Sequence, residues 1–70
     1  MNNVIQMVGI REYVGFAMEE LYTRMPMMNE WQEQMAREQF TADFLQMGQG
    51  ERAEAFKNLL QDLAGRRLQL

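Results

Sequence analysis

The chain has 70 residues, a net charge of −3 and 47% hydrophobic residues, so it forms one small domain and is not composed like a disordered segment. It contains neither cysteine nor histidine. This excludes disulfides and thiolate metal sites, and it removes the commonest metal ligand and the commonest general base. We therefore expect no metal, no cofactor and no enzymatic activity, and the acidic charge argues against a partner held through phosphates.

Its length and hydropathy set two further expectations. A chain this short buries only about 60% of its unfolded surface. Without a disulfide or metal, self-association is the remaining way to enlarge the core, which predicts a homodimer. No stretch approaches the roughly 20 apolar residues that a membrane span needs, and the start MNNVIQMVG lacks the basic end and long apolar core of a signal peptide. We expect a cytoplasmic protein that does not enter membranes.

The first predicted helix covers residues 4–24. Asn3 and Gln6 have the spacing of a capping pair, a polar N-cap followed by an amide three residues later. Apolar residues then recur at the helical period. This stripe consists of Met7, Ile10, Val14, Ala17, Met18, Leu21 and Met25.

Two glycines affect the prediction of this first helix. Gly15 in a helix interior costs about 1 kcal/mol relative to alanine, and we expect it where another helix packs closely. Gly9 leaves an alternative open, in which residues 4–8 are extended and the helix begins near Ile10.

Pro26, the only proline, predicts a turn. It disfavours the helical conformation at Met25, so the first helix ends there. Asn29 and Gln32 form a second capping pair directly after the turn. We expect the second helix to cover residues 28–47.

The second helix has apolar residues on two roughly opposite faces. One face carries Met27, Met28, Trp31, Met35, Ala42 and Leu45, and the other carries Ala36, Phe40, Phe44 and Met47. A helix with two apolar faces needs two partners, and a three-helix chain can supply only part of that cover. The excess predicts either a homodimer seam or a binding surface for another protein.

Tryptophan and methionine are typical of interface cores, and tryptophan is a frequent binding hot spot. We predict a protein-binding surface with Trp31 as its anchor, made of Tyr22, Met27, Met28, Trp31 and Met35 and rimmed by Glu30, Glu33 and Arg37. The alternative is that these apolar side chains belong to the core. The predicted dimer seam consists of Met7, Ile10, Val14, Leu21, Phe40 and Phe44.

The third predicted helix covers residues 51–65. Gly48 is placed to end the second helix in the left-handed conformation, Gly50 to start the third and Gly65 to end it. One face is apolar throughout and is predicted to be core, namely Ala53, Phe56, Leu59, Leu60 and Leu63.

These elements predict an all-α domain of two to three antiparallel helices, completed by homodimerisation. The predicted function is a non-enzymatic protein-binding module, a small homodimeric regulator or inhibitor that docks on a larger protein. In being short, acidic, helical and free of catalytic residues, the chain is similar to small antagonist proteins made by bacteriophages and mobile elements. That likeness includes no motif, so it assigns no residue roles.

The alternative function is a small dimeric nucleic-acid-binding or transcription accessory protein. Basic residues do gather late in the chain, at Arg52, Lys57, Arg66 and Arg67. Glu51, Glu54 and Asp62 are interleaved with them and dilute the positive field. The turn before the third helix also lacks the small residue that a helix-turn-helix packs beneath it, so nucleic acid is the less favoured partner.

Overall fold

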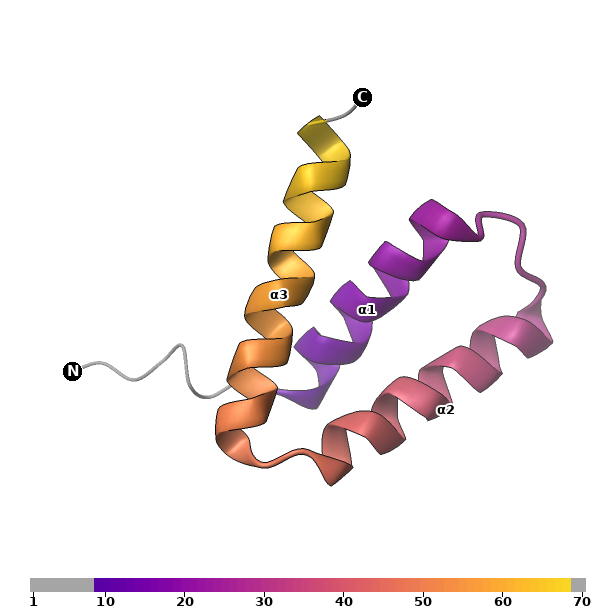
Figure 1. Cartoon of the computed structure of the whole chain (residues 1–70). Coiled ribbons are helices and arrows are strands. Elements are labelled where there is room, and N and C mark those ends of the chain that lie inside the picture. The colour runs from indigo at the N-terminus through magenta and orange to yellow at the C-terminus, as the bar shows by residue number, and fades with distance from the viewer. Residues whose placement is uncertain (1–8, 69–70) are drawn as a thin grey trace.

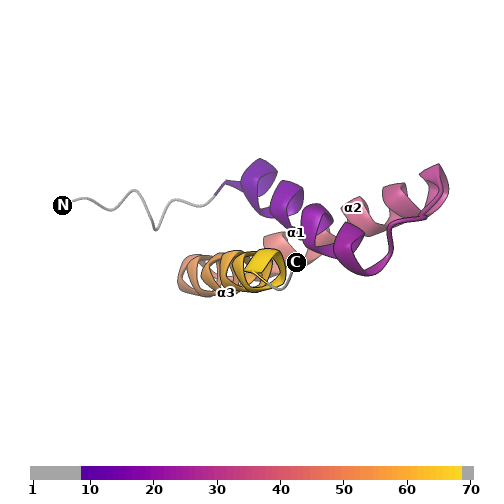
Figure 2. The same cartoon turned by 90° about the horizontal axis from the view of Figure 1, so that it is seen from above.

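The computed structural model describes the backbone of residues 9–68 and the side chains of residues 9–65. This part of the chain holds three helices and no strand: α1 (Ile10–Arg24), α2 (Glu30–Gln46) and α3 (Gln49–Leu68). The prediction of an all-helical fold is confirmed. α1 and α2 form an antiparallel hairpin, and α3 runs back across α1 at an angle to it (Figure 1). Viewed from above, α3 is seen end-on at a different level from α1 (Figure 2).

The turn between α1 and α2 follows the sequence prediction closely. α1 ends at Arg24, and the N–H of Met25 caps it by donating to the Leu21 carbonyl at 2.8 Å. Asn29 is the N-cap of α2 and forms a complete capping box with Gln32: the Gln32 N–H donates to Asn29 Oδ1 at 2.8 Å, and the Asn29 N–H donates to Gln32 Oε1 at 3.0 Å. Both reciprocal bonds satisfy backbone donors that the first turn leaves open.

The beginning of α1 corrects the prediction of one helix over residues 4–24. Gly9 is extended (φ −86°, ψ 158°) and is the N-cap residue, so the helix begins at Ile10, as in the alternative. The Glu12 carboxylate occupies the space where a side chain at position 9 would project. The predicted Asn3–Gln6 cap and Met7 lie outside the described residues.

The glycines around α3 also act differently from the prediction. No described glycine has a positive φ, so Gly48 is not a left-handed cap. Instead it begins α3: its N–H donates to Glu51 Oε1 at 2.8 Å, and its carbonyl accepts from the Arg52 N–H at 2.9 Å. Gly50 lies inside the helix, and so does Gly65, since α3 continues to Leu68. Gly65 does not adopt the left-handed conformation in which a glycine commonly ends a helix.

Gly15 lies on an exposed part of α1, and no other helix comes within 4 Å of where a Cβ would stand, so the expected close helix contact is absent. We expect Gly15→Ala to raise the free energy of unfolding by about 1 kcal/mol, because alanine loses less backbone entropy in a helix. Urea denaturation measures this directly. Gly9→Ala is the comparison and gives no such gain, because Gly9 is the N-cap of α1 and alanine is a poorer N-cap than glycine.

The core lies where the three helices meet around the Phe44 ring. Tyr13 from α1 packs against this ring from α2, with centroids 5.4 Å apart. The Arg52 guanidinium from α3 covers it at 4.1 Å. A second aromatic contact, between Phe16 and Phe56 at 5.6 Å, joins α1 to α3. Among residues 9–65 the buried side chains are Ala17, Met18, Phe44 and Leu63.

α1 is the central element of this arrangement, because it packs extensively on both other helices while α2 and α3 make few contacts with each other. The predicted apolar side of α3 is largely covered. Leu63 is buried, and Ala53, Phe56 and Leu59 are partly buried. Leu60 departs from this prediction and is 39% exposed.

Candidate functional site

The two apolar faces of α2 have different environments. The side chains of one face are buried or partly buried, and these are Ala36, Phe40, Phe44 and Met47. The other face, which we call the outer face, is defined by Trp31, Met35, Glu38, Ala42 and Leu45, all of which are exposed. Trp31 is 70% exposed, Leu45 64% and Met35 47%. Figure 1 shows why: α2 lies at the edge of the fold with α1 on one side only.

The outer face is continuous along the helix. Its members follow one another at intervals of four, three, four and three residues, so they lie in one stripe along α2. Met27 adds to the stripe just before the helix begins and is 91% exposed. Met28 beside it is partly buried. Exposed apolar side chains in one contiguous stripe, unlike scattered ones, mark an interaction surface.

The charge on the outer face is low. Glu38 is its only charged member, and its carboxylate accepts a hydrogen bond from Gln34 Nε2 at 3.1 Å. The residues that border the stripe along the helix are uncharged, namely Gln32, Gln34, Gln39, Thr41 and Gln46. Charged side chains, those of Glu30 and Arg37, come near it only beside Trp31. The site is therefore a largely apolar strip with one carboxylate and amide edges.

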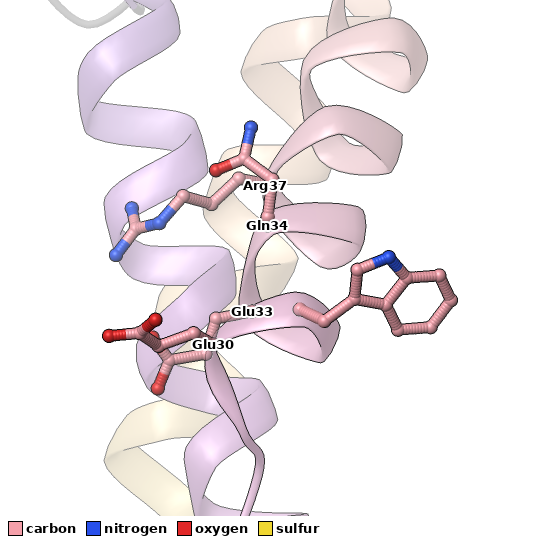
Figure 3. Close-up of a pocket in the computed structure, with 5 residues that line it drawn as sticks. Glu30, Glu33, Gln34 and Arg37 are labelled. Carbon is pink, nitrogen blue, oxygen red and sulfur yellow. The ribbon is translucent and has the colours of Figure 1, made fainter.

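Trp31 lines one shallow pocket of α2 together with Glu30, Glu33, Gln34 and Arg37, whereas Tyr22 does not lie on this face. The side chains of Glu30, Glu33 and Arg37 project from α2 on the side where α1 lies (Figure 3). There Tyr22 of α1 interacts with Glu33 and Arg37. The pKa of Tyr22 is raised, first by desolvation and then by the Glu33 carboxylate, while Arg37 opposes the shift. These polar groups close the hairpin near its turn.

The residues predicted for a dimer seam are largely engaged within the chain. Ile10, Val14, Leu21 and Phe40 are partly buried. Phe44 is only 4% exposed, because Tyr13 and Arg52 cover its ring. The burial of Tyr13 in this cluster raises the pKa of its hydroxyl, with a smaller contribution in the same direction from Asp43.

Sequence reasoning missed the role of Arg52. Its Nε donates to the Phe44 carbonyl at 2.9 Å while its guanidinium stacks on the ring of the same residue. The two residues belong to different helices, so no helical spacing could have indicated the contact. Arg52 is partly buried, so it contributes less to the basic surface on which the nucleic-acid alternative depends. Lys57, another residue of that surface, is exposed.

A shallow groove runs along the junction of the three helices, lined among others by Tyr13 and Ala17 from α1, Phe40 from α2 and Leu59 from α3. Within the part of the chain that the structure describes, no group of three acidic side chains is placed to hold a metal ion. None of the helices described is both long and apolar enough to cross a membrane.

Comparisons with known proteins add no relative: no protein-family model matches the chain, and no curated protein or solved structure is significantly similar to it.

Proposed function

We propose that this chain is a non-enzymatic protein-binding module, a small regulator or inhibitor that docks on a larger protein through the outer face of α2. One observation carries the proposal: Trp31, the only tryptophan, is 70% exposed in a stripe of exposed apolar side chains. Burying apolar surface is worth roughly 25 cal/mol per Å². Tryptophan and methionine are both enriched in the cores of protein interfaces, where the flexible methionines adapt to the partner.

The chemistry of the face favours a protein over a nucleic acid. Its borders along the helix carry glutamine and threonine, so it offers little positive charge to a phosphate backbone. Glutamine edges around an apolar strip suit a helix or sheet surface that presents apolar groups with polar margins. Arg52, which would strengthen a basic patch, is committed to Phe44.

The test is capture of a partner by tagged protein from cells of the source organism. We expect one stoichiometric protein to be retained by the wild type and lost from Trp31→Ala, because removal of a central aromatic anchor typically costs 2 kcal/mol or more, roughly thirtyfold in affinity. Leu60→Ala is the matched control, since it also truncates an exposed apolar residue but lies on α3. Retention of generic DNA that falls steeply with salt, with no protein partner, would contradict the proposal.

A further inference from the structure

We infer that in the free protein the outer face of α2 is covered by a second copy of this chain, with the two α2 helices packed antiparallel. This inference rests on the proposed function, because it names an occupant for the same protein-binding face. The stripe has the alternating four- and three-residue spacing of a two-helix seam, from Trp31 through Met35, Glu38 and Ala42 to Leu45. Its side chains are exposed and α2 lies at the edge of the fold (Figure 1), so both copies can approach without disturbing the hairpin.

The charge distribution permits a copy of the same chain. Each chain carries a net charge of −3, so two copies repel each other overall. The repulsion is weaker at the outer face, because Glu38 is its only charged member and its borders along the helix are neutral amides and a hydroxyl. Glutamine side chains both donate and accept hydrogen bonds, so identical edges can pair with one another. A seam here avoids the like-charge contacts that identical surfaces otherwise impose.

The orientation follows from Glu38. In a parallel pair each Glu38 would stand opposite Glu38 of the second copy, and like charges at a seam are unfavourable. An antiparallel pair avoids this when its two-fold axis passes between positions 36 and 37. Glu38 then lies beside Met35 of the second copy. Its stem packs on the thioether, and its carboxylate keeps the hydrogen bond from Gln34.

The same register matches large side chains with small ones. It sets Trp31 against Ala42 of the second copy, so the indole fills the space that the small residue leaves. Leu45, near the end of the helix, reaches Met27 and Met28 of the second copy, which lie just before α2 begins. Trp31, Ala42 and Leu45 therefore each gain an apolar neighbour, Met35 packs on the stem of Glu38, and Met27, the most exposed of the described methionines, is included.

One face holds one occupant at a time, so self-association and docking on another protein exclude each other. The homodimer is then the resting form, and a partner must bind more tightly than the second copy does. Only the monomer has a free docking face, and the fraction of monomer falls as the protein concentration rises.

The first measurement is the oligomeric state of the full chain by sedimentation equilibrium. We expect a dimer at about 10 μM, with a melting temperature that rises with protein concentration. Trp31→Ala is expected to weaken the dimer at least thirtyfold while the helix content by circular dichroism stays unchanged. Leu60→Ala on α3 is the control and leaves the dimer intact.

The register is tested by exchanging the two residues that face each other. Ala42→Trp alone places a second indole opposite Trp31 of the other copy, and this crowding is expected to dissociate the dimer. The fold of each chain is kept, because position 42 is exposed. The double variant Trp31→Ala with Ala42→Trp restores one large and one small residue per layer and is expected to recover the dimer. A parallel pair places each position opposite itself and gives no recovery.

A wild-type chain that stays monomeric to about 100 μM overturns the inference, and so does a dimer that tolerates Ala42→Trp or is not recovered by the double variant. These outcomes are distinct from failure of the proposed function. A monomer that still captures a different protein through Trp31 refutes the second copy and leaves the docking face in place, whereas a monomer with no Trp31-dependent partner refutes both.

Discussion

Phe44→Ala is expected to lower the free energy of unfolding by about 3–5 kcal/mol. The ring is 4% exposed and touches both other helices, through Tyr13 and Arg52. Its removal opens a cavity, takes away an aromatic pair and leaves the Arg52 guanidinium without its ring. A chain of this length has roughly 4–10 kcal/mol of stability in total. Urea denaturation followed by circular dichroism at 222 nm measures the loss.

Phe44→Leu separates the volume of the ring from its aromatic character. Leucine keeps most of the buried apolar surface but cannot stack on Tyr13 or hold a cation, so we expect a loss of about 1–2 kcal/mol. The Arg52–carbonyl hydrogen bond uses the backbone of position 44 and remains available in both variants. Equal stability of the wild type and Phe44→Ala would show that the three helices do not meet at this ring.

Leu63→Ala is expected to cost about 2–3 kcal/mol, because Leu63 is the buried apolar side chain that α3 contributes to the core. α3 has few contacts with α2, so its docking depends on its contacts with α1. Amide hydrogen exchange should therefore show the loss of protection first along α3. The hairpin of α1 and α2 keeps its own contacts, including the Tyr13–Phe44 pair.

The control is Leu60→Ala, the same substitution one turn earlier in α3. Leu60 is 39% exposed against 6% for Leu63, so its truncation is expected to cost less than about 1 kcal/mol. The reverse order of the two losses would place the other side of α3 against α1 and would contradict the packing described above.

The sequence predicted best those features that depend on residues within one helical turn of each other, such as the ends of helices. Pro26 ended α1, and the Asn29–Gln32 capping box started α2, because caps and proline act on neighbours three or four residues away. The two apolar faces of α2 followed in the same way from helical spacing. The packing of α1 determines which face is covered, and helical spacing alone does not predict that packing. The sequence therefore left two possibilities for Trp31, core or surface, and the structure places it on the surface.

The features that sequence reasoning misplaced depend on contacts between helices or on backbone angles that glycine does not fix. Tyr22 was grouped with Trp31 although it interacts with Glu33 and Arg37 on the other side of α2. Arg52 was read as part of a basic surface although it covers Phe44. The sequence predicts a left-handed cap at Gly48 and a helix end at Gly65, but glycine permits such breaks without requiring them.

The central position of α1 also sets an order for assembly. The entropy lost in closing a loop grows with its length, so contacts across the short proline turn form at the lowest cost. The Tyr22–Glu33 pair lies beside that turn, the Tyr13–Phe44 pair at the far end of the hairpin, and the Phe16–Phe56 pair spans the longest segment. The hairpin therefore closes from the turn outward and α3 docks last. Substitutions near the turn slow the folding rate, whereas substitutions on α3 chiefly accelerate unfolding.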